Sequence, residues 1–144
     1  MRPLHVHFVD DNMADLMLTN EILESHADVV EVSTSLSGPA ALEFLRDSRN
    51  SRPDVVVLDI NMPGLSGFEV LAAMKSDPAL VDIPVVMLST SSNPRDVAQA
   101  YTLHASSYLV KAHDFQQFVQ QIEAFITYLR QTRLTHWPNA MTDA

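Results

Sequence analysis

The segment VVVLDINMPGLSG, residues 55–67, decides the fold class of this chain. Its first four residues are apolar and three of them are β-branched, which is typical of a strand covered on both faces. The run ends at Asp59, a turn sequence follows, and a helix is expected from Ser66 to Ser76. A buried strand that leads directly into a helix is one half of a β-α-β unit. The segment therefore predicts an α/β protein.

The same alternation of apolar runs and helical stretches extends in both directions from this segment. The further strands are expected at residues 4–9, 29–33, 85–88 and 107–110, and the further helices at 12–26, from Ser37 onward, at 93–104 and at 114–133. Strands separated by helices pair in parallel through right-handed crossovers. The predicted architecture is a flavodoxin-like (βα)5 fold, a doubly wound parallel five-stranded sheet in the order 2-1-3-4-5.

Three finer expectations concern the side chains that face the core. In the first helix, Ala14, Leu18 and Ile22 recur every four residues and are expected to face inward. In the first strand, His5 and His7 alternate with apolar residues and are expected on one face of its open end, with metal ligation as the alternative. The last helix carries an apolar stripe made of Phe115, Phe118, Val119, Ile122, Phe125, Ile126 and Leu129.

Length, charge and composition exclude several classes of protein. The chain has 144 residues, about one domain, and no cysteine, which excludes disulfides and thiolate metal sites. Its 18 acidic and 9 basic residues give a formal charge of −9, which disfavours binding to nucleic acid or to anionic membrane surfaces. No apolar run approaches the roughly 20 residues of a membrane span, and the N-terminus turns acidic at Asp10. A cytoplasmic protein is expected.

Chemically active side chains follow the expected strands, at the point where each strand ends. These are Asp10-Asp11, Asp59, Ser89-Thr90 and Lys111. The carboxyl ends of parallel strands meet at one edge of such a sheet, so we expect these side chains to converge. Clustered carboxylates repel one another and suit Mg²⁺, while an aspartate at the same edge can attack a phosphoryl group and a lysine can hold its oxygens.

Four motifs make this chain resemble the receiver domains of two-component response regulators. They are Val9-Asp10-Asp11-Asn12, then residues 57–67, then Pro84-Val85-Val86-Met87-Leu88-Ser89, then Tyr108-Leu109-Val110-Lys111. The resemblance extends over roughly residues 4–133, with the motifs in the family's order and at its spacing. It implies a stand-alone signalling protein rather than an enzyme, phosphorylated on Asp59 by a sensor histidine kinase.

The resemblance also implies a role for each side chain at the strand ends. The implied ligands of Mg²⁺ or Mn²⁺ are Asp11, Asp59, the main-chain carbonyl of Asn61 and, through water, Asp10. The implied switch hydroxyl, phosphoryl-binding ammonium and switch aromatic are Ser89 rather than Thr90, Lys111 and Tyr108.

A narrower resemblance points to the stand-alone regulators that are paired with bacterial phytochrome kinases. It is carried by residues 10–15, 18–21, 88–91 and 101–105. One position departs from the general pattern, because Ala112 follows Lys111 where receivers usually have a cis-linked proline. A cis bond before a residue other than proline costs about 2.5–4 kcal/mol, so we expect this bond to be trans.

The expected organisation is one receiver domain over residues 1–134 and a short tail over 135–144, with no effector domain. Output would then be protein–protein contact or onward transfer of the phosphoryl group. We also expect a homodimer formed by the helix 93–104, the strand 107–110 and the helix 114–133. The residues expected on this face are Tyr101, Leu109, Ala124 and Tyr128.

Two other functions compete with this interpretation. An aspartate-nucleophile phosphohydrolase also needs an aspartate at a strand end, Mg²⁺ and a lysine. That class normally has a second acid two residues after the nucleophile, where this chain has Asn61. The other candidate is an adaptor that never needs phosphate, against which the complete set of strand-end residues argues.

Overall fold

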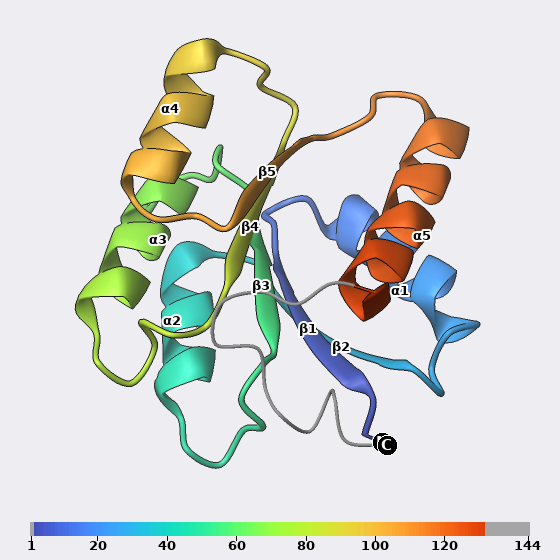
Figure 1. The fold of residues 1–144 in the computed structure, drawn as a ribbon, viewed down its shortest axis with the longest axis horizontal. Helices are drawn as coiled ribbons and strands as arrows, with labels where there is room; N and C mark the ends of the chain where they lie inside the picture. The colour runs from blue at the N-terminus through green and yellow to red at the C-terminus, as the bar shows by residue number, and fades with distance from the viewer. Residues whose placement is uncertain (1, 132–144) are drawn as a thin grey trace.

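In the computed structural model, residues 2–131 are described, and they form five strands and five helices (Figure 1). The strands are β1 (Leu4–Val9), β2 (Val30–Ser35), β3 (Val55–Leu58), β4 (Val85–Ser89) and β5 (Ser107–Val110). The helices are α1 (Met13–Glu24), α2 (Gly38–Arg46), α3 (Gly67–Ser76), α4 (Pro94–Thr102) and α5 (Phe115–Gln131). The expected tail at 135–144 lies outside the described residues.

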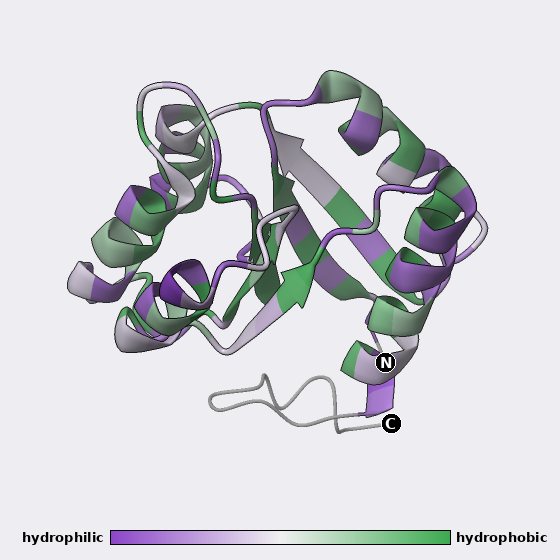
Figure 2. Cartoon of the chain, turned by 90° about the horizontal axis from the view of Figure 1, so that it is seen from above, coloured by the Kyte–Doolittle hydropathy of each residue, from purple (hydrophilic) through white to green (hydrophobic). Residues whose placement is uncertain are grey.

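The strands form one parallel sheet in the order β2-β1-β3-β4-β5, which confirms the predicted topology. Helices α1 and α5 cover one face of the sheet, and α2, α3 and α4 cover the other (Figure 1). Seen from above, the sheet lies between these two helical layers (Figure 2). No helix among residues 2–131 is long and apolar enough to cross a membrane.

The core consists of two apolar clusters, one on each face of the sheet. Strand β3 contributes to both, because Val55 and Val57 face α1 and α5 whereas Val56 and Leu58 face the opposite layer. All four side chains are at most 2% exposed. Full burial of such a side chain stabilises the fold by about 1.5–3 kcal/mol. The strand that carries Asp59 is therefore held firmly between the layers.

Helix α1 buries a different stripe from the one expected. Leu16, Thr19 and Leu23 are buried, Leu18 and Ile22 are partly buried, and Ala14 is exposed. The expectation failed because it counted apolar residues only. The Thr19 hydroxyl donates a hydrogen bond to the Asp15 carbonyl at 2.8 Å, so this polar residue can face the core without losing a partner.

The stripe on α5 was predicted correctly except at its first residue. Phe118, Ile122, Phe125, Ile126 and Leu129 are buried and Val119 is partly buried. Phe115 is 63% exposed, because it begins the helix and lies beyond the area that the sheet covers. Strand β2 also differs from its predicted bounds, since it starts and ends later than residues 29–33.

The expectation that His5 and His7 lie at an open strand end was wrong. Both are buried beneath α2, at 3% and 0% exposure. His5 Nε2 and His7 Nδ1 both contact the Ser33 hydroxyl, at 2.7 and 2.6 Å, and His7 Nε2 contacts the Ser35 hydroxyl at 2.8 Å. The His7 ring stacks on Phe44 with 4.3 Å between centroids. We call these two histidines and two serines the histidine–serine seam.

The His7 ring of the seam is neutral near pH 7. Burial, together with the charge of His5, lowers the pKa of His7 to about 4. Within residues 2–131, the group of acidic and histidine side chains that could hold a cation does not include either histidine. The hydroxyl groups of the neighbouring strand satisfy both nitrogen atoms of His7 and the Nε2 atom of His5, whereas the buried Nδ1 atom of His5 has no hydrogen-bond partner.

Candidate functional site

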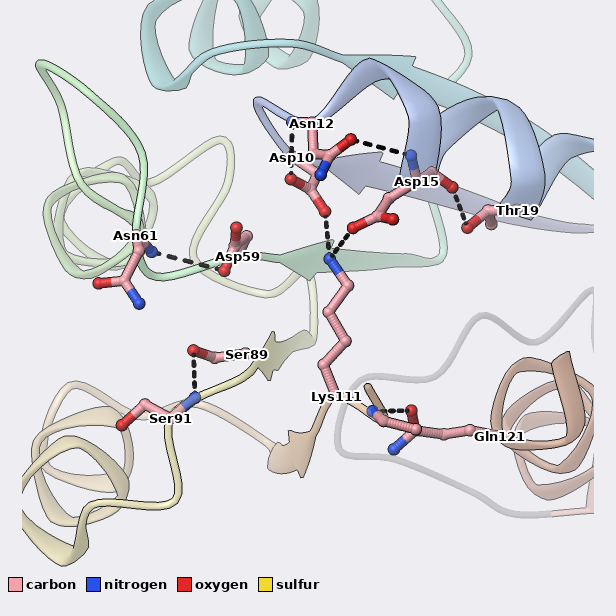
Figure 3. A network of polar contacts seen from close by, with 11 residues as sticks. Asp10, Asn12, Asp15, Thr19, Asp59, Asn61, Ser89, Ser91, Lys111 and Gln121 are labelled. Atoms are coloured by element: carbon pink, nitrogen blue, oxygen red, sulfur yellow. Dashed lines mark hydrogen bonds and ion pairs between the residues drawn. The ribbon is translucent and has the colours of Figure 1, made fainter. Parts of the chain in front are cut away.

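The strand-end side chains that the sequence singled out do converge at the carboxyl edge of the sheet (Figure 3). Asp10 and Asp11 follow β1, Asp59 follows β3, Ser89 ends β4 and Lys111 follows β5. One carboxylate oxygen from each of the three aspartates lies within 4.8 Å of the others. Asp10 is buried, Asp59 is partly buried and Asp11 is exposed, so the cluster opens to solvent on one side.

Backbone hydrogen bonds set the positions of the aspartates. The Asp59 N–H donates to the Val9 carbonyl at 3.0 Å, which places the ends of β3 and β1 side by side. The Asp10 side chain accepts from the Asn12 N–H at 2.9 Å, and the Asn12 side chain then caps α1. The turn after β1 is thus short and fixed, and it presents two carboxylates toward Asp59.

Asp59 lies in an environment that disfavours its charged form. Burial raises the pKa of this carboxyl to about 6, the negative charge of Asp10 adds to the effect, and the positive charge of Lys111 opposes it. The Asn61 N–H approaches the Asp59 side chain at 3.4 Å. Repulsion among carboxylates at this distance is relieved when a cation binds between them.

Gly67 allows α3 to begin directly against Asp59. A Cβ atom at this position would collide with the Asp59 carbonyl oxygen and with the backbone of Ile60. The Gly67 N–H donates to the Ile60 carbonyl at 2.9 Å, and Ser66 and Glu69 form a capping box at the start of the helix. Glycine is required here because the backbone of the helix must approach the loop that carries Asp59 closely.

Lys111 is buried and its ammonium group lies between two carboxylates (Figure 3). Its Nζ is 2.7 Å from Asp10 Oδ2 and 2.6 Å from Asp15 Oδ2. Burial alone lowers the pKa of Lys111, but the hydrogen bonds to Asp10 and Asp15 outweigh it and leave the pKa raised. Asp15 was not among the predicted site residues. Its position in the first turn of the helix after β1 is the signal that could have identified it.

Gln121 holds the main chain on both sides of Lys111. Its Oε1 accepts from the Ala112 N–H at 3.0 Å, and its Nε2 donates to the Val110 carbonyl at 2.6 Å. The Lys111 N–H donates to the Ser89 carbonyl at 2.6 Å. The bond between Lys111 and Ala112 is trans, as expected from its energetic cost. Proline could not make the contact at 112, because it lacks the N–H group.

Ser89 and Tyr108 both contact the same residue of the loop after β4. The Ser89 hydroxyl is fully buried and accepts from the Ser91 N–H at 3.2 Å, whereas Thr90 is exposed. The Tyr108 hydroxyl donates to the Ser91 carbonyl at 2.7 Å. A movement of this loop would therefore change the hydrogen bonds of both side chains.

The four residues expected on a dimer face lie on α4, β5 and α5. Tyr101 and Tyr128 are 50% and 52% exposed, and Ala124 is exposed. Leu109 is only partly exposed, because it packs against the core cluster beneath α5. Three of the four side chains are thus open to solvent in a single chain.

The site as a whole suits the binding of a divalent cation and the transfer of an anionic group. Its ligands are carboxylate oxygens, which Mg²⁺ and Mn²⁺ prefer over nitrogen or sulfur. A buried ammonium lies beside them and can neutralise developing negative charge. A partly buried aspartate at the centre can serve as the nucleophile.

Comparison with known proteins agrees with this geometry. Residues 6–123 match the model of the response regulator receiver domain family. The chain is 38% identical over 130 residues to the response regulator Rcp1 of Synechocystis, covering 85% of this chain and 88% of the relative. It is 34% identical to a probable methanogenesis regulatory protein, FilR2, of Methanothrix harundinacea, over 88% of this chain and 83% of that one.

Two solved structures are similar in both fold and sequence. The Mn²⁺-bound form of Rcp1 superimposes with a TM-score of 0.84 and 33% identity over 92% of this chain and 99% of the other. The phosphorylated cyanobacterial phytochrome response regulator RcpA has the same TM-score and 38% identity, over 92% and 98% of the two chains.

Proposed function

The chain belongs to the family of response regulator receiver domains, and from this premise we propose that it accepts a phosphoryl group on Asp59 from a histidine of a sensor kinase. The observation that carries the proposal is the group Asp10, Asp11 and Asp59 beside the buried ammonium of Lys111. Receiver domains of this kind are generally not enzymes. The only chemistry proposed is transfer to, and loss from, the chain's own aspartate.

The acidic residues fit the divalent cation that receiver domains bind in this pocket. Asp11, Asp59 and the Asn61 main-chain carbonyl would hold Mg²⁺ or Mn²⁺ directly, and Asp10 would hold it through water. When bound, the cation neutralises carboxylate charge and polarises the phosphoryl oxygens.

The proposed step uses groups that already lie at the strand ends. A carboxylate oxygen of Asp59 forms a bond to phosphorus while the bond between phosphorus and the kinase imidazole breaks, and the electron pair returns to that ring. The Lys111 ammonium binds one phosphoryl oxygen and the Ser89 hydroxyl moves to another. Because Ser89 and Tyr108 share the Ser91 contact, the loop after β4 and the Tyr108 ring move together.

The upstream partner is proposed to be a histidine kinase of the phytochrome class. The support is similarity to RcpA, whose description names it a cyanobacterial phytochrome response regulator. We propose a receiver unit over residues 1–134, with output through contact with another protein or onward transfer of the phosphoryl group. A homodimer through α4, β5 and α5 would cover the exposed Tyr101 and Tyr128 rings.

The phosphorylation proposal is tested with acetyl phosphate and Mg²⁺, followed by mass-spectrometric mapping of the adduct. Wild-type protein should gain one phosphoryl group on Asp59, and EDTA should abolish the gain. The Asp59→Asn variant is the matched control and should remain unmodified. Stoichiometric modification of that variant would overturn the assignment.

The dimer proposal is tested by light scattering at micromolar concentration, with and without phosphorylation. Tyr128→Glu places a charge on the exposed part of the proposed face and should give a monomer, and Leu109→Arg should do the same. A monomer in both states of the wild type would refute the dimer. A dimer that tolerates both substitutions would assign it to another surface.

A further inference from the structure

Asp15 holds the ammonium group of Lys111 on the side of the site that lies nearest to α1. The Nζ atom is 2.6 Å from Asp15 Oδ2 and 2.7 Å from Asp10 Oδ2, so two of its three hydrogen atoms have carboxylate partners. Figure 3 shows the ammonium pointing toward these two residues, with Asp59 to one side. Asp15 and Asp59 also line the same small hollow beside Lys111.

The backbone of Asp15 is fixed, so its carboxylate cannot follow the lysine far toward Asp59. The Asp15 N–H donates to the Asn12 side chain at 3.2 Å. The Asp15 carbonyl accepts from the Thr19 hydroxyl at 2.8 Å, and Thr19 is 3% exposed. Any displacement of the ammonium toward a phosphoryl group on Asp59 therefore lengthens its contact with Asp15.

The two carboxylate partners of Lys111 differ in one important respect. Asp10 belongs to the group of three aspartates that can share a cation, and Asp15 does not. A cation in that group competes with Lys111 for the charge of Asp10. When the cation is bound, the contact between Lys111 and Asp15 therefore remains as the attraction that opposes movement of the lysine toward Asp59.

We propose that Asp15 is a positioning residue that competes with the phosphoryl group on Asp59 for the ammonium of Lys111. This inference rests on the proposed phosphorylation of Asp59. A ligand shifts a conformational equilibrium only by its differential contacts with the two states. Because Lys111 loses its contact with Asp15 when it moves to the phosphoryl group, that loss makes the phosphorylated state less stable. Asp15 thereby lowers the affinity of the site for a phosphoryl group.

The test compares wild-type protein with Asp15→Asn, Asp15→Ala and Glu21→Gln. Glu21 is exposed on the same helix, so its substitution removes an equal charge away from the lysine. In the first measurement, the exchange of the Lys111 ammonium protons is followed by NMR in EDTA. In the second, beryllium fluoride is titrated at saturating Mg²⁺ and its binding is followed by ¹⁹F NMR.

Both Asp15 variants should exchange the Lys111 ammonium protons faster than wild type. They should bind beryllium fluoride about three- to tenfold more tightly, because Lys111 no longer has the charged, partly exposed carboxylate of Asp15 as a competing partner. Glu21→Gln should match wild type in both measurements. Equal or weaker binding by both Asp15 variants would overturn the proposal.

The two measurements separate this proposal from the one on which it rests. Failure of wild-type protein to bind beryllium fluoride would count against phosphorylation of Asp59. Exchange of the ammonium protons in EDTA would still decide whether Asp15 holds Lys111. Unchanged exchange in both Asp15 variants would overturn the proposed contact whatever the outcome with beryllium fluoride.

Discussion

The stability of the metal-free protein between pH 7 and pH 5 depends on two groups that act in opposite directions. Burial holds the pKa of His7 at about 4, below its ordinary value of 6.5. The unfolded chain therefore binds more protons at this position than the folded chain does, and stability falls as the pH falls. Burial raises the pKa of Asp59 to about 6, above its ordinary value of 3.8, so protonation of Asp59 stabilises the folded chain as the pH falls.

The sizes of the two contributions follow from these pKa values. Acidification from pH 7 to pH 5 lowers the free energy of unfolding by about 2 kcal/mol through His7, because the imidazole becomes protonated in the unfolded chain but not in the folded one. Protonation of Asp59 raises the free energy of unfolding by about 1 kcal/mol over the same interval, after allowance for the partial exposure of this residue to solvent. The free energy of unfolding of the wild-type protein should therefore fall by only about 1 kcal/mol through His7 and Asp59 together.

The assay is urea unfolding at pH 7 and at pH 5 in EDTA, followed by circular dichroism. Asp59→Asn removes the compensating group, so this variant should lose about 2 kcal/mol. His7→Gln removes the destabilising group, so this variant should become more stable at pH 5 relative to its own value at pH 7. The reasoning is refuted if Asp59→Asn loses no more than wild type, or if His7→Gln retains the wild-type pH dependence.

Five further substitutions and removal of the metal ion test the site. Gly67→Ala should slow phosphorylation by acetyl phosphate, because its methyl group displaces the Asp59 main chain, and an unchanged rate would show that the loop can adjust. Gln121→Ala should slow the same reaction and speed amide exchange at the residue after Lys111, whereas the exposed neighbour Gln120→Ala should do neither. EDTA should abolish phosphorylation by acetyl phosphate. Asp11→Ala should weaken Mg²⁺ binding, measured by calorimetry, more than Asp10→Ala does. The reverse order would contradict direct ligation by Asp11.

The parts of the fold that the sequence predicted best are those in which apolar pattern and burial coincide. Strand 55–58, which is apolar and buried throughout, has its predicted bounds, and strand 107–110 also has its predicted bounds although none of its residues is fully buried. Asp10, Asp59 and Lys111 converge because topology alone brings the ends of parallel strands together. A pattern of apolar residues along the chain was sufficient for both conclusions.

The parts that could not be predicted depend on polar pairs between distant segments. Asp15 contacts Lys111, which lies 96 positions later in the sequence, and Gln121 contacts the main chain of β5 only when α5 packs beside it. The two buried histidines need the serines of β2 as partners. A polar side chain gives no local sign that a partner will satisfy it, so burial of such residues cannot be inferred from periodicity.

The histidine–serine seam limits the order in which its four positions can change during evolution. Replacing Ser33 or Ser35 with an apolar residue leaves a buried nitrogen atom of His7 unsatisfied, at a cost of about 1–3 kcal/mol. Replacing all four together with apolar residues of similar size can be nearly neutral, because no orphaned group remains. Apolar descendants are thus separated from the present sequence by less stable single variants. This part of the chain should change in concerted steps, while the exposed faces of the helices drift one residue at a time.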